Sequence, residues 1–286
     1  MFCKNLLTAC CLLLAAGSYA QTLKNEHLRA IIDAEHNFAH KAHDESMKAA
    51  FTANLDSSGI VVNGNDFVNG LELYSTAKTD TTSLLLWYPE YAQVNDRETF
   101  GFTSGPYHYY ASKKDKPVAS GYFFSVWKKD GSGKFKVMFD GGVTHPVPNG
   151  DFLSAQAMQS DFKLINSIAN NTNDGSLYLE ALNDGIIRHP EKALKYLAPN
   201  ALVLRPGKFA INSSGSLNMY KADSTINFIH LVKGGGYDDS KSMYYCYGSM
   251  AKDAASAQQG KYCGYFVQVW QKRRQGWQLS ADVKQY

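Results

Sequence analysis

The sequence is short of three features: long apolar runs, net charge and cysteine. After residue 20 no segment reaches the ~18 consecutive apolar residues of a membrane-spanning helix, so no membrane contact is expected beyond that point. The formal net charge is +3 over 286 residues and basic residues are scattered, which argues against a nucleic acid as partner. Three of the five cysteines lie within the first eleven residues, so the rest of the chain, with Cys246 and Cys263, can form at most one disulfide.

Recognisable catalytic and cofactor motifs are also missing. There is no nucleophile elbow and no paired-carboxylate arrangement. Gly131-Ser132-Gly133-Lys134 has the residues of a phosphate loop, but it lies between two expected strands and predicts a hairpin turn. His36, His40 and His43 flank the apolar face of the first predicted helix, and no cysteine or distant acidic motif complements them as metal ligands. We therefore expect neither a metal nor a cofactor.

Residues 1–20 have the pattern of a cleavable export signal. Lys4 supplies the positive start, residues 6–16 form an apolar segment too short for a comfortable membrane helix, and Ser18-Tyr19-Ala20 fits a signal-peptidase site. A lipobox-like run, Leu7-Thr8-Ala9-Cys10, precedes most of the apolar segment, which disfavours a lipoprotein. We expect cleavage after Ala20 and a periplasmic or secreted protein.

One stretch of the sequence occurs twice. Gly-Tyr-Phe-Phe-Ser-Val-Trp-Lys-Lys at 121–129 returns as Gly-Tyr-Phe-Val-Gln-Val-Trp-Gln-Lys at 264–272, 143 residues later and without a gap. Each copy continues through a glycine-containing turn into an apolar segment that ends in aspartate, at Asp140 and Asp282. Such a repeat predicts two tandem copies of one domain. We place the first copy in 21–147, a linker in 148–175 and a second, divergent copy in 176–286.

Helical periodicity comes first in the chain, and strands follow. Residues 23–42 predict an amphipathic helix, whose inward side carries Leu28, Ile31, Ile32, Glu35, Phe38, Ala39 and Ala42. Asp44 or Ser46 can cap a second, shorter helix. Strands are expected at 60–62, 84–88, 99–103, 107–110, 119–129 and 134–140, and then at 201–204, 225–232, 242–250, 261–272 and 276–283, with a loop at 234–236. This order predicts an α+β fold with helices on one face of a curved antiparallel sheet.

The strand at 119–129 is apolar on both faces, with Phe123 and Trp127 pointing one way and Phe124 and Val126 the other. We expect the domain's own helix to cover one face and the sister domain's sheet the other, so that the two copies form an intramolecular pseudo-dimer.

Cys246 and Cys263 both fall in the repeated strand pair of the second copy. A hairpin centred near Ala254-Ala255 would place them opposite each other, which predicts a disulfide in an oxidising compartment. The alternative is two free thiols, and in either case the role is structural.

Several segments of the first copy carry a family likeness. They are Leu86-Trp87-Tyr88-Pro89-Glu90-Tyr91-Ala92-Gln93-Val94, Phe100-Gly101-Phe102-Thr103-Ser104-Gly105-Pro106-Tyr107, Gly121-Tyr122 through Val126-Trp127-Lys128, and Val137 to Asp140. They resemble the nuclear-transport-factor-2-like superfamily and, more narrowly, its SnoaL-like and ketosteroid-isomerase-like domains of unknown function in exported bacterial proteins. The likeness covers 26–147 well and 176–286 more weakly. It implies tandem cone-shaped α+β rolls, also called cystatin-like, in which a long helix folds over the sheet and encloses an apolar pocket. The fold implies no particular chemistry.

The resemblance also allows a test for isomerase chemistry. Ketosteroid isomerases need an aspartate base after the first strand, with a tyrosine and a protonated aspartic acid as hydrogen-bond donors. The base falls near Asn63, or near Arg205 in the second copy, and neither accepts a proton. The donor positions fall near Ser125 and Phe38, and Asp66 is the nearest carboxylate if the register slips. Isomerase chemistry is therefore disfavoured.

The remaining candidates suit a binding pocket. Aromatic side chains with a few polar tips are expected to line it, the alternative being ordinary core: Phe38, Trp87, Tyr107, Tyr109, Phe123, Ser125 and Trp127. Asp140 and Asp282 recur at equivalent strand ends, which favours a structural turn role.

Three functions follow from these candidates. The favoured hypothesis is a non-catalytic protein that binds a small apolar molecule or a protein partner. The alternatives are a SnoaL- or isomerase-type lyase, isomerase or cyclase with His36 or Asp66 as base, and a purely structural module. An ionisable group with a shifted pKa facing the pocket would favour the enzyme.

Overall fold

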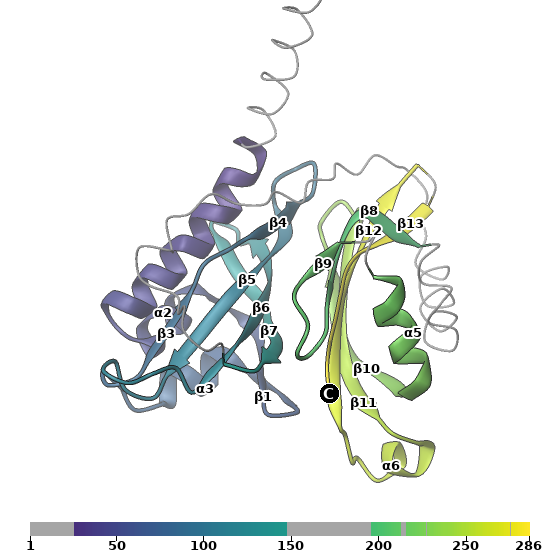
Figure 1. Ribbon diagram of the computed structural model, residues 1–286. Helices are drawn as coiled ribbons and strands as arrows, with labels where there is room; N and C mark the ends of the chain where they lie inside the picture. Colours follow the sequence, from purple (N-terminus) through teal and green to yellow (C-terminus); the bar gives the residue numbers. More distant parts are fainter. Residues whose placement is uncertain (1–25, 148–195, 213–215, 227, 275) are drawn as a thin grey trace, which may run out of the picture.

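Two curved sheets, each with helices on one side, make up the described part of the chain (Figure 1). The computed structural model describes residues 26–147, 196–212, 216–226, 228–274 and 276–286. We call 26–147 domain 1 and 196–286 domain 2. The expected α+β class is confirmed. The predicted export signal, the predicted linker 148–175 and the first 20 residues expected for the second copy, 176–195, lie outside the described residues.

Domain 1 places its helices before and within a run of strands. They are the N-terminal helix (26–44), α2 (Met47–Asn54), β1 (Leu55–Asn63), β2 (Asp66–Asn69), α3 (Gly70–Thr76), β3 (Leu84–Trp87), β4 (Tyr91–Val94), β5 (Phe100–Tyr110), β6 (Ala119–Lys129) and β7 (Phe135–His145). The sheet order is β2-β1-β7-β6-β5-β3, and β4 also pairs with β5. Because β1 and β7 run parallel, the sheet is mixed and not purely antiparallel as expected. Residues 99–103 and 107–110, expected as two strands, belong to the single strand β5.

The first two helices of domain 1 form where the sequence predicts them, whereas α3 was not expected. The N-terminal helix buries Leu28, Ile31 and Phe38 against the concave side of the sheet, as its periodicity requires. Ser46 is the N-cap of α2, and its hydroxyl accepts a hydrogen bond from the backbone N–H of Ala49 at 3.1 Å. The result is a helix-covered cone whose interior is rich in aromatic side chains.

Domain 2 repeats the strand order of domain 1. It contains β8 (Leu197–Leu204), β9 (Ile211–Asn212), α5 (Leu217–Ile226), β10 (Ile229–Tyr237), β11 (Met243–Ala251), α6 (Ala254–Gln258), β12 (Gly264–Arg273) and β13 (Gly276–Gln285). Its order is β9-β8-β13-β12-β11-β10, with β8 and β13 parallel. Two expectations are wrong here. The strand expected at 225–232 begins only at Ile229, because α5 extends to Ile226, and the glycine triplet 234–236 belongs to β10, where pairing with β11 holds it extended.

The two domains match residue by residue around one bulge. The β6–β7 register shifts between Val126 and Trp127, and the β12–β13 register shifts at the repeated positions Val269 and Trp270. The strand pairs then put Ser125 opposite Asp140 and Gln268 opposite Asp282. Asp140 and Asp282 are therefore structural equivalents.

The parallel pairs extend this correspondence to the first strand of each domain. Val61 lies beside Asp140, and Val203 lies beside Asp282. Two residues further along, Asn63 of domain 1 is the counterpart of Arg205 of domain 2.

The outer faces of the two sheets pack against each other in the centre of the molecule, with the N-terminal helix and α5 on the outside (Figure 1). Phe100, Phe102 and Phe139 of domain 1 share one apolar cluster with residues of domain 2. The Asn95 side-chain amide donates to Asp238 Oδ2 at 2.7 Å. These residues lie 143 positions apart, so they are repeat equivalents that contact each other, as residues on a twofold axis do.

The expected disulfide is absent, because both Cys246 and Cys263 are free thiols. The hairpin register places Cys246 opposite Gln268, while the backbone N–H of Cys263 bonds to the carbonyl of Met250. The helix α6 between the strands moves the centre of the hairpin beyond Ala254-Ala255. The prediction of facing cysteines is therefore wrong by several residues of register.

Within the described ranges, no helix combines the length and the apolar character needed to cross a bilayer.

Candidate functional site

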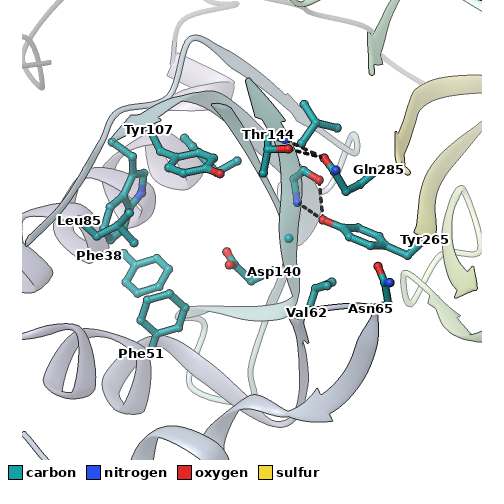
Figure 2. A pocket seen from close by; sticks show the side chains of 16 residues that line it. Phe38, Phe51, Val62, Asn65, Leu85, Tyr107, Asp140, Thr144, Tyr265 and Gln285 are labelled. Carbon is teal, nitrogen blue, oxygen red and sulfur yellow. Dashed lines mark hydrogen bonds between the residues drawn. The ribbon is translucent and has the colours of Figure 1, made fainter. Parts of the chain in front are cut away.

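The cone of domain 1 encloses a cavity of about 490 Å³ (Figure 2). This volume lies within the range of small-molecule sites in proteins. Its walls are mainly aromatic and aliphatic, with a few polar groups: Phe38, Phe51, Val62, Gly64, Asn65, Leu85, Trp87, Tyr107, Phe123, Asp140, Gly141, Gly142, Val143, Thr144, Tyr265 and Gln285. Helices, sheet and the second domain all contribute to this lining.

One wall is a set of aromatic rings packed edge to face. Phe38 lies centrally in this wall, with ring centroids 4.8 Å from Phe51 and 5.1 Å from Trp87, both in T-shaped geometry. Phe51 in turn stacks on Tyr74 at 4.1 Å. These interlocked rings give the cavity a rigid apolar surface.

Behind this wall lies a buried carboxyl group, that of Glu35. Its oxygens accept hydrogen bonds from Trp87 Nε1 at 2.6 Å, Thr103 Oγ1 at 2.5 Å and Trp127 Nε1 at 3.1 Å. Burial raises the pKa of Glu35 to about 7, against the opposing effect of these three donors. Glu35 thus ties the N-terminal helix to β3, β5 and β6 and orients the Trp87 ring on the cavity wall.

Asp140 is the ionisable group that faces into the cavity from β7, between the Phe38–Phe51 pair and Tyr265 (Figure 2). Its Oδ2 accepts a hydrogen bond from Ser125 Oγ at 2.8 Å. Burial raises the pKa of Asp140 to about 7, and the Ser125 hydrogen bond opposes the shift. Near neutral pH this carboxyl can therefore donate a hydrogen bond, accept one or exchange a proton.

Domain 2 contributes two side chains, Tyr265 and Gln285, to the cavity wall. The Tyr265 hydroxyl accepts from the backbone N–H of Gly142 at 3.0 Å and donates to its carbonyl oxygen at 2.5 Å. Gln285 Oε1 accepts from the backbone N–H of Thr144 at 2.7 Å. Gly142 has φ of 152°, and a Cβ there would lie 2.1 Å from the Tyr122 carbonyl oxygen, so this junction requires glycine.

The equivalent region of domain 2 is filled by a buried ion cluster around Arg205. Arg205 Nη2 lies 2.7 Å from Asp223 Oδ2 and 2.6 Å from Asp282 Oδ2, and Lys284 Nζ lies 3.0 Å from Asp223 Oδ2. Tyr220 also donates to Asp282 Oδ2 at 2.9 Å. Although burial opposes ionisation, attraction to Arg205 and Lys284 holds the pKa of Asp282 below its ordinary value.

Four of the predicted lining residues lie on the cavity wall: Phe38, Trp87, Tyr107 and Phe123. Ser125 contacts the cavity through its bond to Asp140, and Trp127 lies deeper, bonded to Glu35. Tyr109 is half-buried and is not among the lining residues.

The two residues considered as bases lie elsewhere. His36 is half-buried on the N-terminal helix, and Asp66 is exposed on β2 beside Asn63; neither lines the cavity. Among the described residues there is no group of three His, Cys, Asp or Glu side chains that could hold a metal.

Sequence reasoning missed the two carboxyls that matter most. The structural turn role expected for Asp140 is wrong, because its side chain faces the cavity and bonds to Ser125. Glu35 had a visible signal, a carboxyl on the apolar side of an amphipathic helix, which demands a buried partner.

No protein-family model matches the chain, and no curated protein matches it. Solved structures that it is similar to include a protein of unknown function with a cystatin-like fold from Nostoc punctiforme, at 15% identity over 41% of this chain and 90% of that one, with a TM-score of 0.33. Another is a nuclear-transport-factor-2-like protein from Cytophaga hutchinsonii, at 11% identity over 40% of this chain and 98% of that one, with a TM-score of 0.30. A third is a conserved protein from Planctomyces limnophilus, at 12% identity over 45% and 99%, with a TM-score of 0.35. Each likeness spans less than half of this chain, and none assigns an activity to it.

Proposed function

We propose that this chain binds a small, largely apolar molecule in the domain 1 cavity, with one polar group of that molecule held by Asp140. The observation that carries the proposal is a cavity of about 490 Å³ with aromatic walls and one carboxyl directed into it. Apolar walls supply affinity by burying ligand surface, and a single polar group fixes orientation. We further propose that the protein acts after export and that its two domains work as one intramolecular pair.

Binding is favoured over catalysis because the cavity offers few groups for proton transfer. Asp140 faces it alone among the carboxyls of the described chain, since Glu35 is sealed behind the aromatic wall. Burial raises the pKa of Tyr107, and the Tyr265 hydroxyl is already engaged with Gly142. Near pH 7 both hydroxyls stay protonated, so the described wall offers no second base beside Asp140.

The binding proposal is tested with N-phenyl-1-naphthylamine, a neutral apolar dye that fluoresces when it leaves water. We expect saturable fluorescence enhancement with one dye per chain. Leu85→Trp fills the cavity from β3 and should reduce dye binding at least about tenfold. Val232→Trp, at a position that is 53% exposed on β10, is the matched control and should bind dye normally.

Thermal melts of both variants show whether they fold, and Val62→Phe is the second cavity-filling variant if Leu85→Trp does not fold. Absence of saturable binding, or equal binding by the filled and control variants, would refute the proposal.

One observation favours a second candidate, proton-transfer catalysis of the lyase, isomerase or cyclase type. A carboxyl with a pKa of about 7 in an apolar cavity is suited to act as a general base at neutral pH. The test uses 2-tetralone, an apolar ketone with exchangeable α-protons, in D₂O followed by NMR. Exchange accelerated by the protein and lost in Asp140→Asn would support catalysis, and exchange at the buffer rate would exclude Asp140 as a base for this ketone.

A further inference from the structure

The two domains surround a pair of equivalent aspartates with different partners, cations in domain 2 and a serine hydroxyl in domain 1. Asp282 of domain 2 lies beside the guanidinium of Arg205, with Lys284 in the same cluster. Asp140, its counterpart in domain 1, bonds to Ser125, and among the described residues no lysine, arginine or histidine forms an ion pair with it. The internal repeat therefore provides a comparison between a site with a cation and a site without one.

Arg205 shows in detail how this fold holds a cation. Its side chain is 2% exposed, and all five of its N–H groups have acceptors. The acceptors are the carboxylates of Asp223 and Asp282 and two backbone carbonyls. The guanidinium carbon also lies 5.4 Å from the centre of the Tyr220 ring. Carboxylate and aromatic ring together compensate for the loss of water around the charge.

Domain 1 offers the same two components, a carboxyl and aromatic rings, around its cavity. Asn63, the counterpart of Arg205, is an exposed and uncharged residue at the end of β1, so it supplies no positive charge to Asp140. Asp140 instead faces a cavity lined by aromatic side chains, Phe38, Phe51 and Trp87 of domain 1 and Tyr265 of domain 2. Aromatic faces attract ammonium and guanidinium groups, most strongly where water is excluded.

We propose that the domain 1 cavity binds an organic cation, a small amine or guanidine with an apolar aromatic or aliphatic body. The charged group lies against Asp140, as the Arg205 guanidinium lies against Asp282, and the apolar body lies against the rings of Phe38, Phe51 and Trp87. This inference rests on the proposed binding function and specifies the chemical class of the ligand.

Domain 2 contributes a tyrosine to the domain 1 cavity, but domain 1 does not contribute the equivalent tyrosine to domain 2. Its Tyr265 lines the domain 1 cavity, whereas the hydroxyl of the repeat equivalent in domain 1, Tyr122, lies 3.4 Å from Glu90 Oε2 of its own domain. The chain therefore has one open cation site and one site occupied by its own arginine.

Binding of a cation requires Asp140 to be ionised, so the groups facing it matter. Ser125 donates to it directly, and Glu35, Tyr74 and Tyr265 are the titratable groups that interact with it electrostatically. Burial raises the pKa of Tyr74, and likewise that of Tyr265, above the ordinary value, so both hydroxyls stay neutral near pH 7. Since these neighbours supply no positive charge, a bound cation would stabilise the ionised form of Asp140.

Calorimetric titration of the exported chain with a matched pair of ligands tests the inference. 2-Naphthylmethylamine is protonated at pH 8, and 2-naphthylmethanol has the same body without charge. We expect the amine to bind about tenfold more tightly or better, because a charge-assisted bond replaces a neutral one. The preference should weaken as the pH falls from 8 to 6, because Asp140 then takes up a proton.

Two variants complete the test. Asp140→Asn should reduce amine binding to the level of the alcohol while leaving alcohol binding within about threefold. Asn63→Arg copies the arrangement of domain 2 and should abolish amine binding while the protein stays folded. If the alcohol binds as well as the amine, the cation inference is wrong and the general binding function stands. If neither ligand binds, both are wrong.

Discussion

Asp140→Asn should remove part of the pH dependence of the free energy of unfolding. The substitution keeps the shape of the side chain and its contact with Ser125 but removes the titrating group. In the folded chain burial raises the pKa of Asp140 to about 7, whereas an unfolded aspartate titrates near 3.8. A raised carboxyl pKa means that the contribution of this group to stability is present at low pH and is lost as the pH rises toward 7.

The magnitude follows from the two pKa values. Each unit of difference corresponds to about 1.4 kcal/mol, so the full loss is about 4 kcal/mol above pH 7. Between pH 5 and pH 8 the loss is about 2–3 kcal/mol, because part of it has already occurred below pH 5. Water that enters the cavity screens the carboxylate and lowers this to about 2 kcal/mol. Glu35, whose pKa burial also raises to about 7, is present in both proteins and largely cancels from the comparison.

Urea denaturation of the wild type and Asp140→Asn at pH 5 and pH 8 measures the effect. We expect the asparagine variant to gain about 2 kcal/mol of unfolding free energy relative to the wild type on going from pH 5 to pH 8. Ser132→Ala, in the exposed β6–β7 turn, is a control whose pH profile should parallel that of the wild type. Parallel profiles for Asp140→Asn and the wild type would refute the description of Asp140 as a desolvated carboxyl.

Three further predictions concern the second domain and the domain junction. Arg205→Met should cost about 3–5 kcal/mol in urea denaturation, because it leaves two buried carboxylates without their main partner. Gly142→Ala should lower stability by several kcal/mol, seen as a lower melting temperature, because the new methyl group meets the Tyr122 carbonyl. Cys246 and Cys263 should both react with Ellman's reagent when the protein is unfolded without any reductant, because both are free thiols in the structure.

Each of these predictions has a control and a contrary result. Lys208→Met, at an exposed position near Arg205 in the chain, should leave stability unchanged, and an equal loss there would show that cation burial is not the cause. Gly131→Ala, where nothing lies within 4 Å, is the control for Gly142→Ala, and equal effects would contradict the steric argument. If the unfolded chain showed no reactive thiol, Cys246 and Cys263 would be joined in the disulfide that the sequence predicts.

The fold was predictable because its signals are periodic and local. The apolar helix face with Leu28 and Phe38 and the turn at Gly131–Gly133 follow from neighbours in the sequence, and the 143-residue repeat follows from comparing two segments of the same sequence. Strand ends were less predictable, since β5 continues through Gly105 and Pro106 where the sequence indicates a break. Pairing with β6 on one side holds this segment extended despite its residues.

Part of the cavity wall was predictable for the same reason. Phe38, Trp87, Tyr107 and Phe123 are large apolar residues on inward positions of their elements, so composition and alternation suffice to select them. The pattern could not separate them from Trp127, which packs one layer deeper with Glu35.

The sequence by itself determined the two-domain plan, the leading helices and main strands of the first domain, and the aromatic character of that domain. Only the tertiary structure decided the chemistry of the site. Asp140 and Asp282 occupy the same repeated position, yet one faces an open cavity and the other an arginine. The difference arises from Asn63 and Arg205 on a neighbouring strand that is distant in sequence, and from Tyr265 in the other domain. Desolvation and charge pairing depend on which groups surround a side chain in space, and local sequence patterns do not record that.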